Sequence, residues 1–257
     1  MARKKIEKLN ITPEELKLAE TMERKAAVLK SIKVNVKAKN ERQKTYWKHL
    51  KNCNKQIVIG SGSPGSGKSY MSLSWALKSL KDGECDNVVI IVPTIQSGGE
   101  ELSIGYLKGD VIMKTQPFQD ADMFTLEKIL KQGGTTDPRW TVENLVKEGY
   151  IKWELVNFIL GKTFDNSLIL VNEAEQYTKE NMRAILTRMG ENSRFVISGD
   201  EKQVNRKSIL KKHEECGLTF ITNAFKEFEE VAHVAFSDED IVRNPFITKM
   251  LKVFDKK

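Results

Sequence analysis

The chain has 257 residues, 40% of them hydrophobic, which is typical of one large globular domain with or without an appendage. No apolar run approaches the roughly 20 residues needed to cross a bilayer, and no apolar segment follows the charged N-terminus as in a secretory signal. The composition therefore predicts a protein that neither spans a membrane nor is exported. The net charge of +7 is uneven, because residues 1–55 hold 16 Lys and Arg against 6 Asp and Glu.

Residues 1–39 are predicted to form a basic helical extension. Thr12 can cap a helix, Pro13 suits its first position, and Glu15 completes a capping box, so a helix is expected to run to about Ser31.

The segment after this helix alternates between apolar and polar residues. Residues 32–37 are therefore predicted to form a short edge strand, with a domain boundary near residue 39 and a second helix over residues 41–51. The basic excess suits contact with a nucleic-acid backbone, and a merely solvated helix face explains it equally well.

Residues 40–257 alternate between short apolar runs and helical segments. The predicted strands cover residues 56–60, 87–92, part of 150–159, 168–171, 194–198 and 231–236. The predicted helices cover residues 68–80, 120–131, 179–189 and most of the chain from residue 240 onward, with a loop over residues 132–139. This alternation predicts an α/β fold with a mainly parallel sheet and helices on both faces.

The three cysteines, Cys53, Cys85 and Cys216, are scattered and odd in number. They form neither a CxxC pair nor a Cys/His metal spacing. We therefore expect reduced thiols and a cytoplasmic protein.

Residues 62–69 read Gly-Ser-Pro-Gly-Ser-Gly-Lys-Ser and match the phosphate-binding pattern G-x-x-x-x-G-K-[ST] at every fixed position. Glycines let the backbone wrap around phosphate, Lys68 supplies a cation for the β- and γ-phosphates, and the Ser69 hydroxyl can bind Mg²⁺. The apolar strand before the loop and the helix after it argue against an incidental glycine-rich turn. The motif predicts binding of a nucleoside triphosphate, with ATP as the first choice.

A second strand of a P-loop enzyme usually ends in an acid that holds magnesium. Here the strand over residues 168–171 is followed by Asn172 and Glu173. Asn172 can accept from a magnesium-bound water but lacks the charge, and a unit charge pair at about 5 Å and an effective dielectric of about 20 is worth ~3 kcal/mol. We therefore expect weakened magnesium binding or hydrolysis. Glu173 is placed to act as a general base, the alternative being a surface glutamate at a strand end.

A further polar group, Asp200 to Gln203, follows the strand over residues 194–198. Gln203 can sense a γ-phosphate or orient water, as a glutamine does at other phosphoryl-transfer sites, with Asp200 supporting it or approaching the metal. A plain polar loop is the alternative. Ligands bind at the carboxyl ends of parallel strands, which favours the functional interpretation.

These residues, in their order and spacing, resemble the PhoH-like ATPases, a phosphate-starvation-inducible group related to superfamily 1 helicases, over roughly residues 40–257. The segments that carry the resemblance are Gln43-Lys44-Thr45-Tyr46, Gly98-Gly99-Glu100-Glu101-Leu102, Gly105-Tyr106-Leu107-Lys108-Gly109-Asp110, Glu148-Gly149-Tyr150-Ile151, Gly161-Lys162-Thr163-Phe164, Asn172-Glu173-Ala174, Leu186-Thr187-Arg188-Met189-Gly190, Gly199-Asp200 with Gln203, and Asp240-Ile241-Val242-Arg243-Asn244-Pro245.

The resemblance implies a RecA-like P-loop NTPase fold, ATP and Mg²⁺ as ligands, and an adenine contact by Gln43. It also implies a homo-oligomeric ring, often a hexamer, in which Arg243 is a candidate arginine finger and Arg188 a weaker one; a helix-terminal salt bridge is an equal alternative for Arg243. The predicted nucleotide-binding residues are Gln43, Gly62, Ser63, Pro64, Gly65, Ser66, Gly67, Lys68, Ser69 and Tyr70. The predicted metal residues are Ser69 and Asn172, and the predicted catalytic residues are Lys68, Glu173, Gln203 and Arg243.

Four positions depart from the family pattern and indicate a divergent member, of a kind that a phage could encode. Asn172 replaces an aspartate, Lys162 an arginine and Lys108 a proline, and Val92 stands where the family usually has an arginine.

Three functions are compatible with these patterns. The first is an ATPase whose hydrolysis is coupled to remodelling of RNA or single-stranded DNA, and here removal of residues 1–39 is expected to spare ATP binding but weaken nucleic-acid binding. The second is a slow or inactive nucleotide-binding assembly module, which Asn172 favours. The third is a P-loop kinase, for which the loop Asp137-Pro138-Arg139 offers a single lid arginine.

Overall fold

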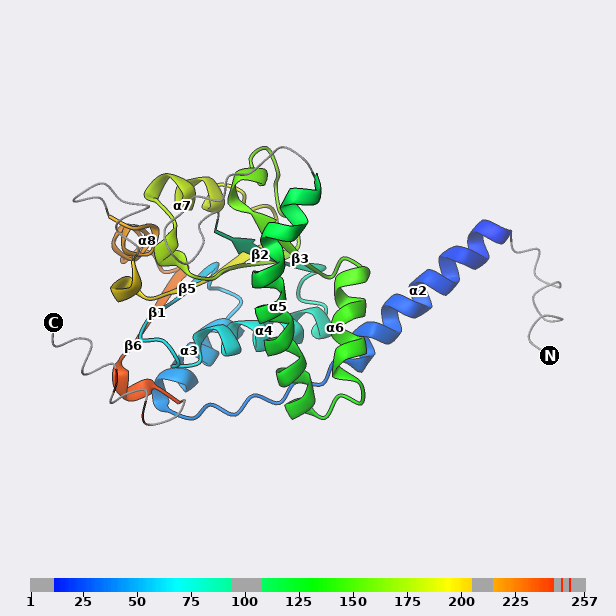
Figure 1. Cartoon of the computed structure of the whole chain (residues 1–257), viewed down its shortest axis with the longest axis horizontal. Helices are drawn as coiled ribbons and strands as arrows, with labels where there is room; N and C mark the ends of the chain where they lie inside the picture. Colours follow the sequence, from blue (N-terminus) through cyan, green and yellow to red (C-terminus); the bar gives the residue numbers. More distant parts are fainter. Residues whose placement is uncertain (1–11, 94–107, 205–214, 243–245, 247–249, 251–257) are drawn as a thin grey trace.

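The structure, a computed structural model, describes residues 12–93, 108–204, 215–242, 246 and 250, with residues 108–115 described through their backbone alone. Six strands form one sheet in the order β3-β2-β4-β5-β1-β6 (Figure 1). Their bounds are Ile57–Gly62 (β1), Asn87–Val92 (β2), Ile151–Leu155 (β3), Ser167–Val171 (β4), Arg194–Gly199 (β5) and Val231–Phe236 (β6). Every neighbouring pair in this sheet is parallel, which confirms the predicted sheet type.

Helices cover both faces of the sheet, as predicted. One face packs against α2 (Pro13–Ser31), α3 (Glu41–Lys51), α4 (Lys68–Asp82), α5 (Lys108–Gly133) and α6 (Pro138–Lys147). The other packs against α7 (Lys179–Leu186) and α8 (Gly217–Ala224). Four short 3₁₀ turns complete the described elements: η1 (Val156–Phe158), η2 (Ala174–Gln176), η3 (Glu201–Gln203) and η4 (Asp238–Asp240).

The composition of the strands follows from this layering. In β2, Val88 and Ile90 enter the core beneath α4, while Val89 and Ile91 enter the core beneath α7 and α8. A strand buried on both sides needs apolar residues in succession rather than in alternation. Within the described parts of the chain, no helix has the length and apolarity to cross a membrane.

The N-terminal extension differs from its prediction in two ways. Residues 32–39 form no strand; they run as extended chain from α2 to α3, and the Lys33 N–H donates to Thr135 Oγ1 (3.1 Å) at the α5–α6 corner instead of to a sheet edge (Figure 1). Val28 and Ile32 are fully buried in the core beneath α4, so the core crosses the predicted boundary near residue 39. Removal of residues 1–39 would therefore expose the core, while the first turns of α2 project from the body (Figure 1).

Several helices also differ from the predicted ones. α5 begins well before residue 120, and α8 was not predicted. α6 replaces part of the predicted loop over residues 132–139: Asp137 caps it, accepting from the Trp140 N–H (2.9 Å), and Pro138 takes its first turn. Arg139, the arginine on which a kinase lid would depend, pairs with Glu143 on the surface of this helix (2.8 Å).

The predicted C-terminal boundaries are only partly met. α7 ends at Leu186, three residues before the predicted end. The helix predicted from residue 240 does not begin there, because Asp240 lies in η4 and residues 241 and 242 are not helical. Beyond them, the described positions Phe246 and Met250 are helical.

Candidate functional site

The loop from Gly62 to Lys68 joins β1 to α4 and has the backbone that phosphate binding requires. Gly62, Gly65 and Gly67 all have positive φ, at 106°, 81° and 91°. At Gly62 the constraint is also steric, because a Cβ there would lie 1.9 Å from the carbonyl oxygen of Phe236 in β6. A side chain at this position cannot coexist with the β1–β6 pairing.

Lys68 occupies the interior of this loop. Its side chain is 8% exposed, and its ammonium donates to the carbonyls of Gly62 and Ser63 (2.9 Å for Ser63) and to Ser66 Oγ (3.3 Å). A buried ammonium needs acceptors on several sides, and phosphate oxygens supply them as well as carbonyls do. Together with the N-terminus of α4, this cradle fits a polyphosphate.

The C-terminal part of the chain supports the loop from outside. The Ser63 N–H donates to Phe236 O (3.4 Å), the Ser63 hydroxyl donates to Asp238, and the Val242 N–H donates to Gly65 O (3.1 Å). The Asp240 carboxylate holds the turn that carries these groups by accepting from the Ser237 N–H (2.9 Å). Residues 236–242 are thus part of the phosphate-binding structure.

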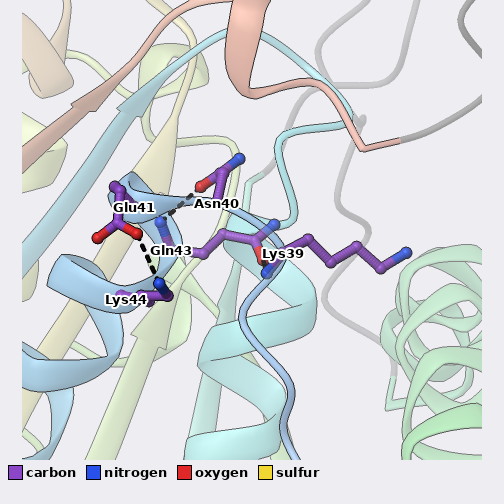
Figure 2. A network of polar contacts seen from close by, with 5 residues as sticks. All are labelled: Lys39, Asn40, Glu41, Gln43 and Lys44. Carbon is purple, nitrogen blue, oxygen red and sulfur yellow. Dashed lines mark hydrogen bonds and ion pairs between the residues drawn. The ribbon is translucent and has the colours of Figure 1, made fainter.

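Gln43 supports the loop from the N-terminal side. Its side-chain amide, 3% exposed, donates to Ser66 O (2.7 Å) and accepts from the Lys39 N–H (2.8 Å). Figure 2 shows this side chain reaching from α3 towards Lys39, with Asn40 capping the helix by accepting from the Gln43 N–H (2.8 Å). Asn40 also donates to Asp240 O (3.1 Å), so both supports of the loop are joined.

Two predicted binding residues lie at the start of α4. Ser69 is exposed in the first turn of α4, directly after Lys68. Tyr70 directs its hydroxyl to Gln132 Oε1 at the end of α5 (2.6 Å), so its side chain faces α5 rather than the loop.

The sheet order brings the other predicted groups to the same edge. β5 lies between β1 and β4, so the loop after β1, Glu173 after β4 and Asp200 after β5 all lie at the carboxyl ends of neighbouring parallel strands. With about 4.8 Å between strands, the ends of β1 and β4 are roughly 10 Å apart, which leaves room for a terminal phosphate and a water. Asn172 Oδ1 accepts from Ser198 Oγ (2.9 Å), which fixes its amide.

Glu173 has an unusual backbone. Its φ of 53° and ψ of 45° are left-handed, and the other described non-glycine residues with positive φ are Asn166 and Asn192. Asparagine tolerates this conformation, but glutamate does so at a cost of order 1 kcal/mol. This strained backbone conformation places the exposed carboxylate of Glu173 at the end of β4.

Gln203 is held by Asp200. Its side-chain amide donates to Asp200 Oδ2 (2.8 Å), while Asp200 Oδ1 accepts from the Lys202 N–H (3.1 Å). Asp200 is buried and Gln203 is exposed, so the buried carboxylate fixes the orientation of the exposed side-chain amide.

Sequence reasoning missed two acids near this edge. Glu175 is 1% exposed, and burial, followed by the charge of Glu173 and a hydrogen bond to it, raises the pKa of Glu175 to about 8. Burial also raises the pKa of Asp122 in α5 to about 6, although the hydrogen bond from Trp153 Nε1 (2.9 Å) opposes this. The signal that the sequence offered for Glu175 was its position two residues after Glu173.

Of the two candidate arginines, the structure describes Arg188, and it lies away from this edge. Arg188 follows α7 and precedes β5, and its guanidinium donates to Lys162 O (3.4 Å) and Thr187 Oγ1 (3.2 Å), near the amino ends of the strands. Lys162 itself pairs with Glu154 (2.7 Å). Arg243 lies outside the described residues, as do residues 98–102, 105–107, 244 and 245 of the family-like segments.

A parallel sheet in which one strand separates the phosphate loop from the acid-bearing strand end is the layout of a RecA-like P-loop nucleotide-binding domain. The chain belongs to the PhoH-like protein family, whose model matches residues 35–255. The resemblance inferred from the short segments is thereby confirmed.

Named relatives agree with this assignment. The chain is 27% identical over 222 residues to a PhoH-like protein of Bacillus subtilis (strain 168), covering 86% of this chain and 65% of the relative. It is 26% identical over 221 residues to a PhoH-like protein of Synechocystis sp., covering 86% and 62%, and 26% identical over 217 residues to Protein PhoH of Escherichia coli (strain K12), covering 84% and 57%. The chain thus spans less than two thirds of the length of these relatives.

Proposed function

We propose that this protein binds ATP and hydrolyses it to ADP and phosphate. The observation that carries the proposal is the meeting, at one edge of the sheet, of a phosphate cradle around Lys68 and the strained carboxylate of Glu173. A binding module needs only the cradle; a carboxylate held in a costly conformation beside it has a use in hydrolysis.

The described residues divide the work of hydrolysis. Lys68 exchanges its carbonyl partners for β- and γ-phosphate oxygens and stabilises the charge that develops there. Glu173 orients a water in line with the γ-phosphate and accepts its proton. Gln203, aimed by Asp200, contacts the γ-phosphate or the same water.

Ser69 and, through a water, Asn172 are the residues that would hold Mg²⁺. A hydroxyl and an amide oxygen are oxygen ligands of the kind that magnesium accepts, and most of its remaining ligands are typically phosphates and water. When bound, the ion neutralises phosphate charge. In the described part of the chain, no group of three His, Cys, Asp or Glu side chains is placed to form a separate metal site.

Lys68→Ala is expected to lower ATP affinity and phosphate release by about 10²-fold or more, because the loop loses the cation that pairs with the terminal phosphates. ATP binding by calorimetry and phosphate release are measured on the same preparations. Lys78→Ala is the matched control, since Lys78 lies on the same helix but pairs with Asp82 at the surface. Equal ATP binding by the Lys68 variant and the unaltered chain would contradict the proposal.

We further propose that hydrolysis is coupled to RNA or single-stranded DNA, and that the protein acts as a homo-oligomeric ring in which Arg243 reaches a neighbouring site. The basic excess of residues 1–55 supports the first part, and the family resemblance supports both. Phosphate release is therefore measured with and without each nucleic acid at several salt concentrations, and the particle mass by light scattering. Stimulation that falls as salt rises supports the coupling.

A second candidate, a slowly hydrolysing nucleotide-binding assembly module, is favoured by Asn172. An aspartate there would add a unit negative charge near the magnesium site, worth ~3 kcal/mol for each unit of the ion's charge at about 5 Å and an effective dielectric of about 20. Asn172→Asp is expected to raise Mg²⁺ affinity and turnover about tenfold or more. Magnesium titrations of phosphate release measure both, and Asn181→Asp on α7 controls for the added charge. An unchanged magnesium midpoint would show that Asn172 does not limit the reaction.

A further inference from the structure

Three side-chain contacts join the residues that follow β4 to those at the end of β5. Ser198 Oγ donates to Asn172 Oδ1 (2.9 Å) and the Asp200 N–H donates to Glu175 Oε2 (2.9 Å). Gln176 Nε2 donates to Gln203 O (3.3 Å). Glu175 contributes the carboxyl group that takes part in these three contacts, and it is the most deeply buried of the residues involved.

Glu175 is wedged between the two strand ends. Its carboxylate lies so close to Gly199 that a Cβ on that residue would be 2.3 Å from Glu175 Oε2. Burying a carboxyl group is costly unless it is hydrogen-bonded, and an apolar side chain would fill the same space more cheaply. A role in packing alone therefore does not account for an acid here.

The contacts of Glu175 lead in both directions. On one side Glu175 lies in the turn η2, two positions after Glu173, the residue assigned as general base, which caps that turn. On the other it holds the backbone N–H of Asp200, whose carboxylate in turn holds the side chain of Gln203. The turn η2 and the contacts of Glu175, Asp200 and Gln203 thus connect the assigned base to the residue proposed to contact the γ-phosphate or the water.

We propose that Glu175 is a positioning residue that sets Glu173 and Gln203 relative to each other, so that contact of Gln203 with the γ-phosphate orients Glu173 towards the water. The inference rests on the proposed ATP hydrolysis and adds to it a link between phosphate sensing and the base. Glu175 itself touches neither nucleotide nor water. Its removal therefore affects turnover and leaves ATP binding, which depends on the loop around Lys68, intact.

The test compares Glu175→Leu, Glu175→Gln and the control Glu180→Gln, an exposed glutamate of α7. Glu175→Leu is expected to lower kcat about 10- to 100-fold with KM and ATP affinity within about twofold, the pattern of an interaction made only in the transition state. Glu175→Gln keeps an acceptor for the Asp200 N–H and is expected to restore kcat to within about threefold of the unaltered chain. Melting curves identify any variant that fails to fold.

A double-variant cycle with Gln203→Ala separates linkage from general support. If Glu175 acts through Gln203, the double variant loses little more than the worse single variant, whereas independent residues give multiplied losses. Multiplied losses, an unchanged kcat in a folded Glu175→Leu chain, or a rise in KM equal to the fall in kcat would each overturn the inference. A lack of phosphate release by the unaltered chain would instead refute the proposed function itself.

Discussion

Glu173→Gln is expected to lower ATP turnover by about 10²- to 10⁴-fold, the usual contribution of a general base, while ATP affinity stays within about twofold. The amide has the size of the carboxylate but cannot accept the proton of the attacking water. The exposed side chain of Glu173 contributes nothing to the cradle around Lys68, so binding has no reason to change. Single-turnover phosphate release and calorimetric ATP binding measure the two effects separately.

The matched control for this substitution is Glu191→Gln. Glu191 is also exposed but lies just before β5, at the opposite edge of the sheet. Turnover by Glu173→Gln equal to that of the control would remove Glu173 from the mechanism and strengthen the view of the chain as a binding module.

Gly62→Ala is expected to lower the free energy of unfolding by about 3 kcal/mol or more and to abolish ATP binding in any folded fraction. The added Cβ would lie 1.9 Å from Phe236 O, and the φ of 106° is one that alanine rarely adopts. Relief of this contact requires β6 to move away from β1 at the point where both support the loop. A loss of 3 kcal/mol in a domain of this size lowers Tm by roughly 6–12 °C.

Gly83→Ala separates the two causes. Gly83 has a φ of 72° after α4, but a Cβ there meets nothing within 4 Å, so only the conformational cost of about 1 kcal/mol applies. Thermal melting of both variants, followed by ATP titration, gives the comparison. Equal losses of stability would mean that the contact with Phe236 carries no weight.

The sequence was most informative where local chemistry alone determines structure. Strands buried on both faces are continuous apolar runs, and the loop around Lys68 needs its glycines wherever it occurs, so the sheet and the phosphate cradle were both predictable. The assignment of Glu173 and Gln203 to the same edge followed from the direction of parallel strands.

The features that the sequence did not predict depend mostly on residues far away in the chain. Residues 32–37 alternate like a strand, but a threonine some 100 positions away satisfies Lys33, and no spacing announces that partner. Glu175 reads as one more polar residue after a strand; only the fold shows that Gly199 and Asp200 enclose it. The loop predicted over residues 132–139 ends in Asp137-Pro138-Arg139, where an N-cap aspartate followed by proline starts α6 instead.

The support of the phosphate loop by residues 236–242 has a consequence for the order in which the domain is assembled. β1 lies between β5 and β6, both of which are synthesised long after it, and Asp238 and Val242 come later still. During synthesis the loop sequence emerges early, with Gln43 to support it from one side but without the contacts that residues 236–242 make on the other. Nascent chains are thus expected to acquire nucleotide binding abruptly, once β6 has joined the sheet, rather than gradually as the chain lengthens.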